Sequence, residues 1–537
     1  MLTAKQIADK LGVDNKIGEV LKSRGMDSME LIDDFINTDL DKQHDPANLP
    51  DIEKLIQKIK EVTYFGKIGV YSDYDVDGVT SAYLFTEFLD KLSPNAEYDV
   101  FLSNRFKDGY GLSRRAVDYF VGEDVDMVVT LDCGITAYQQ VEYAKSKGLE
   151  VMIFDHHESQ NVPDTEYFLD LKVNQGFYPF RELCTAGLIW KVGQALLDEG
   201  LYEYIDETML ATVADVVPLV DENRIIVSNG LDKIKSKSNM VNEGIKLISE
   251  IQDVKQDEIS AEDIAFSIAP PLNAVGRLGP AYDAFDLLKS EDNIKLNMLV
   301  EKLRRLNKRR QDLTSDIMND VNRNLDKSGN VIVEEASAHQ GLVGLIAGRI
   351  TTRYKKPSMI VDERTRKGSA RSVKPFNIYE NLNRCYQEGL LEKAGGHEMA
   401  AGFEVKKEKF DEFKERMFEL SQNVDYTVNE YDVRLDTEKI DYAFIDDLKV
   451  LEPCGEGNEK PLFLTEGVDV TGIKLLTDGL HVKFKVDGIE AIAFRMGHKS
   501  DILRNEKVDI IYTLGINDWN DKYEIQMIVR NISRSDE

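Results

Sequence analysis

Short apolar runs alternate with stretches of helical periodicity from about residue 50 onward. Three of these runs, at residues 67–70, 127–131 and 151–154, have the length of buried strands, and each continues directly into polar side chains. After the first run, apolar residues recur at helical spacing through residues 82–89. Strands that alternate with helices are typical of a parallel sheet. The fold class predicted for this part of the chain is therefore α/β.

The hydrophobic pattern changes along the rest of the chain, and its 537 residues favour three or four domains. From Leu299 to Val321 apolar residues keep helical spacing without proline. A continuous helix of about thirty residues there would span about 45 Å, enough to join two domains. Short strands with Gly and Asn turns near the C-terminus favour an OB-type β-barrel. The predicted domains are residues 1–45 (N-terminal helices), 46–235 (parallel-sheet catalytic domain), 236–330 (helical connector), 331–425 (a second, smaller α/β domain) and 426–537 (the barrel).

Composition narrows the class of protein. Hydrophobic residues make up 42% of the chain, enough for packed cores, and we see neither a signal-peptide pattern nor an apolar run of transmembrane length. We therefore expect a soluble, cytoplasmic protein with no membrane partner. The four cysteines form no C-x-x-C pair, so neither a zinc site nor a disulfide framework is indicated. A net charge of −30 argues against a general nucleic-acid coat, but local basic patches and bound metals can still bring nucleic acid to the chain.

Acidic and imidazole side chains follow each of the three apolar runs. They are Asp73, Asp75 and Asp77 after the first run, Asp132 after the second, and Asp155, His156 and His157 after the third. The carboxyl ends of parallel strands meet at one edge of a sheet, where ligands bind. Asp215 ends an apolar helical stretch and either joins this group or caps the next element. Carboxylates gathered in this way repel one another unless cations lie between them, and oxygen ligands suit Mg²⁺ or Mn²⁺.

Two other interpretations of the first acidic cluster remain open from the residues alone. It could be a solvated acidic turn with a helix-capping aspartate. It could also be the start of a calcium loop, but such a loop has glutamate at its twelfth position, where this chain has Leu84. Calcium is therefore disfavoured.

Four motifs in order resemble the signature of the DHH phosphoesterase superfamily. They are D-x-D-G at 75–78, D-C-G at 132–134, D-H-H at 155–157 and A-D-V-V-P at 214–218. The resemblance implies a phosphoesterase that uses two Mn²⁺ or Mg²⁺ ions. It implies metal ligands at Asp75, Asp77, Asp132, His156 and Asp215, with Asp132 bridging both ions. It also implies catalytic roles for Asp132 and His157, and an orienting role for Asp73 and Asp155 outside the ligand set.

Basic and aromatic residues suggest where a phosphate chain would bind. Between Leu345 and Pro375 there are nine Lys or Arg against two Asp or Glu, a local reversal of the overall acidity. An arginine flanked by glycines or small residues suits a phosphate, and an exposed aromatic ring suits a base. His397 lies in a stretch that resembles the G-G-H motif of the substrate-binding domain accompanying DHH domains. The candidate substrate contacts are Arg105, Tyr110, Arg277, Arg371, Ser372 and His397.

From about residue 50 onward the chain resembles the RecJ-type exonucleases. The order of domains and the stretch 451–458 carry this resemblance, whereas Tyr71-Ser72 and Cys454 differ from the residues common in that family. The resemblance implies 5′-to-3′ hydrolysis of single-stranded DNA in repair and recombination. Candidate partners are single-stranded DNA and a single-stranded-DNA-binding protein or helicase. Two alternatives are a DHH oligonucleotidase or nucleotide phosphatase acting on very short substrates, and a catalytically silent replication scaffold.

Overall fold

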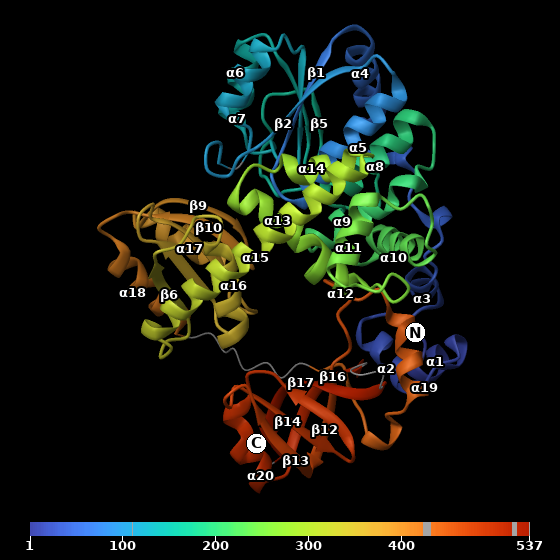
Figure 1. Cartoon of the computed structure of the whole chain (residues 1–537), viewed down its shortest axis with the longest axis vertical. Helices are drawn as coiled ribbons and strands as arrows, with labels where there is room; N and C mark the ends of the chain where they lie inside the picture. The colour runs from blue at the N-terminus through green and yellow to red at the C-terminus, as the bar shows by residue number, and fades with distance from the viewer. Residues whose placement is uncertain (110, 423–430, 518–522, 536–537) are drawn as a thin grey trace. The chain divides into compact units, whose positions relative to one another are not determined.

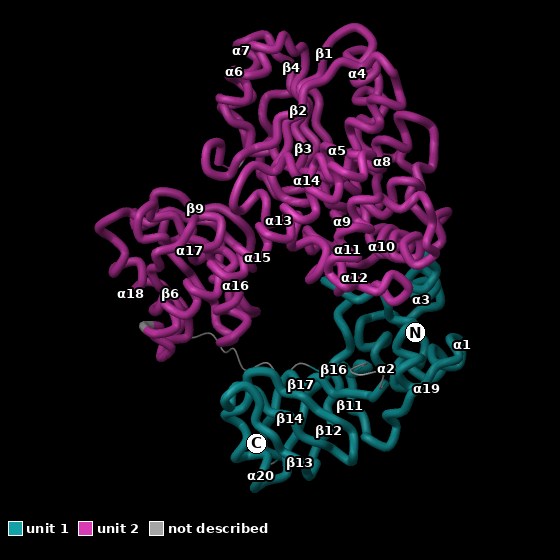
Figure 2. Tube along the Cα trace, in the orientation of Figure 1, with its two compact units in different colours: residues 1–38, 427–537 teal, residues 39–426 magenta. Residues whose placement is uncertain are grey.

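The computed structural model describes residues 1–109, 111–422, 431–517 and 523–535 (Figure 1). The chain divides into two compact units, residues 39–426 and a second unit made of residues 1–38 together with 427–537 (Figure 2). Among the described helices none is long and apolar enough to cross a membrane.

The first half of the larger unit is a parallel sheet between two helical layers. Its strand order is β2-β1-β3-β4-β5, and every pairing is parallel, as predicted. Alternate residues of each strand enter different cores, because successive side chains of a strand point to opposite faces. One core contains α4, α5 and α8, and the other contains α6 and α7. The strands are β1 (Lys67–Ser72), β2 (Glu97–Leu102), β3 (Met127–Leu131), β4 (Glu150–Phe154) and β5 (Tyr167–Leu169). The helices are α4 (Ile52–Phe65), α5 (Val76–Leu92), α6 (Arg114–Gly122), α7 (Tyr138–Ser146) and α8 (Thr185–Leu197).

The helices α9 to α15 follow the parallel sheet along the chain, and the last of them is the long helix of the predicted connector. The long helix α15 (Asn293–Asn324) has 32 residues, which confirms the helix expected from the spacing of its leucines. A π-helical turn, Ile264–Ile268, directly precedes α13, a kind of irregularity that is frequent near functional sites. The other helices are α9 (Ile205–Ala214), α10 (Asp221–Lys235), α11 (Glu243–Ile251), α12 (Ala261–Asp263), α13 (Ala269–Leu278) and α14 (Tyr282–Lys289).

The second half of the larger unit is the predicted smaller α/β domain. Its five-stranded sheet has the order β6-β7-β8-β10-β9, in which only β6 and β7 pair in parallel. The end of α15 and helix α16 pack on one face of the sheet, and α17 and α18 pack on the other. The elements are β6 (Ile332–Ala336), α16 (Val343–Tyr354), β7 (Ser358–Asp362), β8 (Lys367–Arg371), α17 (Ile378–Gln387), β9 (Leu391–His397), β10 (Ala400–Val405) and α18 (Phe410–Ser421).

The second unit brings both ends of the chain together. Its seven-stranded sheet has the order β11-β12-β16-β17-β15-β14-β13. The N-terminal helices share its hydrophobic core, and Arg24 after α2 donates hydrogen bonds to the Asn458 side chain (2.8 Å) and to Glu459 O (2.7 Å) in the loop that enters the sheet. The predicted turn at Trp519-Asn520 lies outside the described residues. The helices are α1 (Ala4–Leu11), α2 (Asn15–Ser23), α3 (Met29–Ile36), α19 (Tyr442–Asp447) and α20 (Ser500–Asn505). The strands are β11 (Val433–Arg434), β12 (Phe463–Val468), β13 (Val470–Leu476), β14 (His481–Val486), β15 (Ile489–Ala493), β16 (Val508–Asn517) and β17 (Glu524–Arg534).

Candidate active site

The turn between β1 and α5 holds the first three aspartates. Asp75 is the N-cap of α5, and its Oδ1 accepts a hydrogen bond from the Gly78 backbone N–H at 3.1 Å. A Cβ atom on Gly78 would lie 2.7 Å from the Asp73 carbonyl oxygen, so glycine is needed there. Asp77 is buried in the first turn of α5. The sequence D-x-D-x-D-G therefore places three carboxylates around one helix N-terminus.

The ends of β3 and β4 bring the remaining predicted groups to the same point. Asp132 follows β3 with a positive φ of 59°, an uncommon backbone conformation for a residue other than glycine. His156 follows β4, and its Nε2 lies 3.3 Å from Asp132 Oδ1, 3.5 Å from Asp215 Oδ2 and 3.8 Å from Asp77 Oδ2. Asp215 is the C-cap residue of α9. Three strand ends and one helix end thus converge, as their order in the sequence suggested.

These side chains fit a site for metal ions. Three groups have all their ligand atoms within 4.8 Å of one another: Asp73, Asp75 and Asp132; Asp77, His156 and Asp215; and Asp132, His156 and His157. His156 is buried, yet neither of its ring nitrogens makes a hydrogen bond within the described part of the chain. A buried imidazole without hydrogen bonds costs free energy unless one of its ring nitrogens binds a metal cation. Asp73 belongs to one of these groups, so it is as well placed to bind an ion as Asp75.

Burial and crowding shift the pKa values of the site. Burial and the charge of Asp75 raise the pKa of Asp73 to about 7 and that of Asp77 to about 6. Burial and the Asp77 carboxylate raise the pKa of Asp132, and that of Asp215, well above the ordinary value. The cluster therefore holds more negative charge than the protein alone stabilises, which divalent cations would offset.

Asp155 and His157 form a pair at the edge of the cluster. Asp155 Oδ1 lies 2.7 Å from His157 Nδ1, and the Asp155 carboxylate also accepts hydrogen bonds from the backbone N–H groups of Ile135 (3.0 Å) and His156 (2.8 Å). Although burial lowers it, the pKa of His157 is raised to about 9 by the charge and hydrogen bond of Asp155. Burial and the His157 charge hold the pKa of His156 well below its ordinary value. The two histidines of the D-H-H motif therefore have different environments.

Arginines gather beside the acidic cluster. Tyr74 stands between Asp73 and Asp75 in the sequence, and the Arg105 guanidinium lies over its ring at 4.3 Å. The Nε atom of Arg105 is buried without a hydrogen-bond partner among the described residues. Burial, with the charges of Arg105 and Arg310, lowers the pKa of Arg277 to about 10. Burial and Arg105 also lower the pKa of Arg371. An anion such as a phosphate would offset the repulsion between arginines placed in this way.

The remaining predicted substrate residues differ in their surroundings. The Ser372 hydroxyl donates a hydrogen bond to Phe376 O at 2.5 Å, so this hydroxyl is not free to donate to a phosphate. Ser369 Oγ accepts from Arg371 Nη1 at 3.3 Å and is the better placed of the two serines. His397 lies at the end of β9 with part of its surface open to solvent, and partial burial together with the charge of Arg371 lowers its pKa. Tyr110 lies outside the described residues.

Several residues of the site were missed by the sequence analysis. The Ser103 hydroxyl donates to Asp73 Oδ1 at 3.0 Å, and the Asn273 side-chain oxygen accepts from the Val76 N–H at 3.3 Å. Thr185 at the start of α8 contacts two of the aspartates. Arg310 on α15 joins the arginines, with its Nε buried and unpartnered among the described residues. None of these residues stands in a recognisable motif. For Arg310 the one available signal was its position on the helix, which places it on a different face from the other basic residues of its run.

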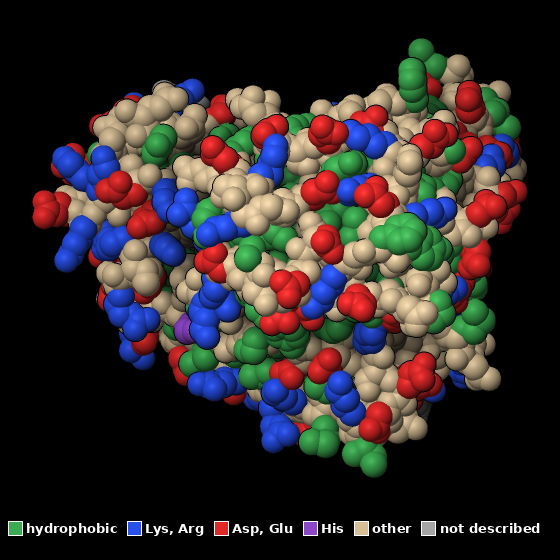
Figure 3. Space-filling view, turned by 90° about the horizontal axis from the view of Figure 1, so that it is seen from above, with side chains coloured by type: hydrophobic (Ala, Val, Ile, Leu, Met, Phe, Trp, Pro, Cys, Tyr) green, Lys and Arg blue, Asp and Glu red, His purple; other side chains and the backbone are tan. Residues whose placement is uncertain are grey.

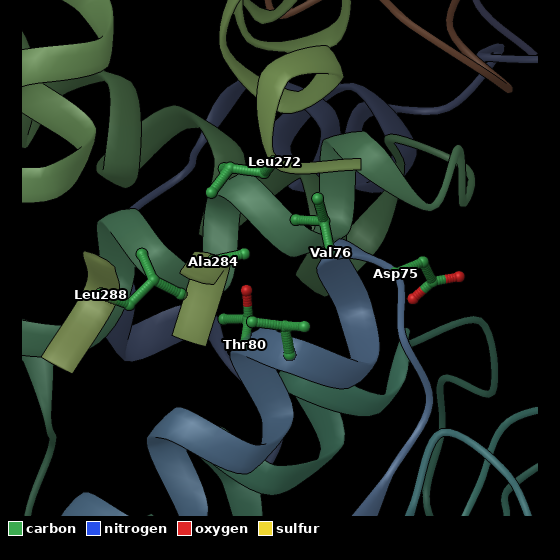
Figure 4. A pocket seen from close by; sticks show the side chains of 7 residues that line it. Asp75, Val76, Thr80, Leu272, Ala284 and Leu288 are labelled. Atoms are coloured by element: carbon green, nitrogen blue, oxygen red, sulfur yellow. The ribbon is translucent and has the colours of Figure 1, made fainter. Parts of the chain in front are cut away.

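Basic side chains gather on one part of the surface, and a small pocket lies beside the acidic turn. On the face seen in Figure 3, Lys and Arg side chains gather toward the left, the side of β9 and α18 in Figure 1, with Asp and Glu spread over the rest. A small apolar pocket lined by α5, α13 and α14 lies next to the acidic turn, but the Asp75 carboxylate points away from it (Figure 4). The pocket is therefore not part of the acidic cluster.

Three family models match consecutive parts of the chain. The DHH family N-terminal domain matches residues 67–218, the DHHA1 domain matches 328–423 and the RecJ OB domain matches 431–531. These matches confirm the predicted fold class, including the C-terminal OB domain. The predicted boundaries of the five domains stay predictions.

Named relatives and solved structures extend the likeness over almost the whole chain. The chain is 31% identical to the single-stranded-DNA-specific exonuclease RecJ of Bacillus subtilis, over 99% of this chain and 70% of that protein. It is 32% identical to the Thermus thermophilus protein of the same name, over 86% and 68%. Crystal structures of Thermus thermophilus RecJ match it with a TM-score of 0.85 in complex with Mn²⁺ (27% identity, 99% and 78% coverage) and 0.76 in complex with Mg²⁺ (26%, 99% and 76%). On this relationship, and on the acidic and imidazole groups assembled at its sheet edge, the chain belongs to the RecJ family of exonucleases.

Proposed function

We propose that this chain is a metal-dependent exonuclease specific for single-stranded DNA, which hydrolyses phosphodiester bonds in the 5′-to-3′ direction during DNA repair and recombination. The observation that carries the proposal is the buried, unsatisfied His156 among carboxylates from three strand ends and α9, beside Arg105 and Arg277, whose Nε atoms are buried without a hydrogen-bond partner among the described residues. The direction and the cellular process rest on the family resemblance of the motifs.

Two Mn²⁺ or Mg²⁺ ions would occupy the acidic cluster. Asp73, Asp75 and Asp132 would hold one ion, and Asp77, His156 and Asp215 the other. Asp132 would be shared, because its Oδ1 lies 3.3 Å from His156 while its carboxylate also belongs to the first group. A pair of divalent ions supplies an activated water and charge stabilisation for both oxygens of an in-line displacement.

The side chains around the ions then orient the substrate. Asp155 fixes the ring of His157 through the 2.7 Å contact at Nδ1, so His157 is held where it can transfer a proton to or from a phosphate oxygen. Arg105, Arg277 and Arg371 would bind phosphates of the strand, since a guanidinium presents paired donors to phosphate oxygens. Arg371 is held ready by hydrogen bonds to Ser369 Oγ (3.3 Å) and Ala370 O (2.9 Å).

Two alternative functions are less well supported. An oligonucleotidase for very short substrates has no evident use for the RecJ OB domain at residues 431–531, a kind of fold that binds long single strands. A silent scaffold would not be expected to keep every predicted ligand position within 4.8 Å of two others. We further propose that the protein acts in the cytoplasm, where a bacterial cell holds its DNA, and that a single-stranded-DNA-binding protein or helicase supplies its substrate.

The test is time-resolved digestion of one oligonucleotide labelled at either end. Single-stranded DNA, the same sequence as duplex and the same sequence as RNA are incubated with Mn²⁺, with Mg²⁺ and with chelator, alongside an Asp132→Asn variant. We expect mononucleotides from the 5′ end of single-stranded DNA only, with either metal and not with the variant. Metal-independent cleavage, internal cuts or equal use of duplex would overturn the proposal. Release from the 3′ end would overturn the direction alone.

A further inference from the structure

The first turn of α8 contacts two of the proposed metal ligands at once. The backbone N–H groups of Thr185 and Ala186 donate to the two carboxylate oxygens of Asp77, each at 2.8 Å. The Thr185 hydroxyl donates to Asp132 Oδ1 at 3.3 Å. Thr185 is fully buried, and the residue before it, Cys184, makes no side-chain cap to the helix. Asp77, a residue of α5, therefore caps the N-terminus of α8, and the hydroxyl of Thr185 connects this cap to Asp132.

This arrangement fixes the relative position of side chains from different elements. Asp77 lies on α5 and Asp132 follows β3, so no local turn holds them together. Each oxygen of a carboxylate has two lone pairs, so the donors from α8 leave lone pairs of Asp77 for an ion. The helix N-terminus also brings about half a positive charge to the carboxylate cluster. Thr185 has a branched Cβ and therefore few side-chain rotamers, which holds its hydroxyl in place.

We propose that Thr185 is a positioning residue for the metal centre: its backbone N–H and its hydroxyl set the placement of Asp77 relative to Asp132 and so preorganise the two ion positions. The inference rests on the proposed function, because it takes both aspartates as metal ligands. Outer partners that orient a ligand typically change metal affinity by ten- to a hundredfold when they are removed. A residue that only starts α8 would change stability and leave metal affinity as it is.

The experiment measures Mn²⁺ binding to the full chain, by electron paramagnetic resonance and calorimetry, before any nuclease assay. Thr185→Val keeps the shape and the backbone contact to Asp77 but removes the hydroxyl. We expect its Mn²⁺ affinity to fall about tenfold, and its kcat to recover at high Mn²⁺. Thr185→Ser keeps the hydroxyl and should bind Mn²⁺ nearly as the wild type does. Thr208→Val is the matched control, because the buried Thr208 hydroxyl donates to the backbone carbonyl of Tyr204, the N-cap residue of α9 (2.8 Å), and not to a carboxylate.

A double-mutant cycle shows whether Thr185 acts through Asp132. In an Asp132→Ala background, Thr185→Val should have no further effect on Mn²⁺ affinity. Unchanged affinity of Thr185→Val in the wild-type background, or an equal loss in the Asp132→Ala background, would overturn the proposal. If Thr185→Val does not fold, Thr185→Ala lacks the same hydroxyl and takes its place. Because binding is read without DNA, a wild type that binds Mn²⁺ but cleaves nothing would refute the proposed function and not this inference.

Discussion

Replacing Arg371 by glutamine should have opposite effects on the stability of the free protein and on its affinity for DNA. The pKa of Arg371 is lowered by burial and by the charge of Arg105, so the folded protein holds this cation at a cost. Its hydrogen bonds go to Ser369 and to the Ala370 carbonyl, and no carboxylate is within salt-bridge distance in the described part of the chain. Arg371→Gln removes the repulsion, so the melting temperature should stay level or rise.

The same change should weaken binding of a single strand considerably. A hydrogen bond to a charged group contributes about 1.5–3 kcal/mol, which corresponds to a loss of about 10- to 150-fold in affinity. Loss of one phosphate contact should also reduce the slope of log K against log salt by about 0.7 for a single strand. The extra charge of a terminal phosphate makes Arg371 a candidate for holding the 5′ end, so the variant should lose its preference for 5′-phosphorylated over 5′-hydroxyl strands.

Both quantities are measurable on one pair of proteins. Fluorescence anisotropy of a labelled strand over a salt series, in an Asp132→Asn background to prevent cleavage, gives affinity and slope, and thermal unfolding gives stability. Arg353→Gln is the matched control, because Arg353 is exposed on α16 in the same basic stretch and rests on the Tyr354 ring (5.4 Å). If the two variants lose the same affinity, only net charge matters and Arg371 contacts no phosphate.

Three further changes test other parts of the structure. Tyr71→Phe removes the 2.7 Å hydrogen bond from the Tyr71 hydroxyl to Gly111 O in the loop that follows β2. Loss of this hydrogen bond should cost about 1 kcal/mol of substrate binding, so KM should rise about fivefold while kcat stays unchanged. A fall in kcat alone would contradict this role. Lys233→Met leaves the buried Asp206 carboxylate without its partner and should cost about 3–5 kcal/mol in urea unfolding, most of which Asp206→Leu should restore. Arg24→Ala should destabilise the barrel unit by about 1–3 kcal/mol, seen as faster hydrogen exchange in the loop that Arg24 contacts, and unchanged exchange there would show that the N-terminal helices are only loosely attached.

The sheet and its acidic edge were predictable because three of its strands are largely apolar runs followed directly by acidic or imidazole side chains. In the structure the predicted runs correspond to β1, β3 and β4, and the residues after each one meet at a single edge. Parallel pairing makes this geometry follow from sequence order alone. The predicted long helix is present for a similar reason, since helical spacing over many residues is a strong local signal.

Contacts made through the backbone or across long sequence distances were not predictable. Thr185 begins an apolar stretch that has no sign of a ligand, because the contacts of Thr185 and Ala186 with Asp77 are made by backbone N–H groups that any sequence would provide. Ser372 was preferred over Ser369, and only the structure shows that the Ser372 hydroxyl is bound to Phe376 O. The N-terminal helices have a recognisable apolar face, but the residues that cover it lie about four hundred positions away. Periodicity identifies a buried face and not its partner.

The acidity of the chain is compatible with DNA binding because charge is separated locally. The net charge is −30, yet the carboxylates of the candidate site are concentrated at one sheet edge, while Arg105, Arg277 and Arg371 repel one another beside it. Each group is unfavourable in the free protein, since burial raises the pKa of Asp132 and Asp215 and lowers that of Arg277 and Arg371. Metal ions would offset the first group and a phosphate chain the second. Ions and strand should therefore bind cooperatively, because a phosphate between the two groups is attracted by both the ions and the arginines.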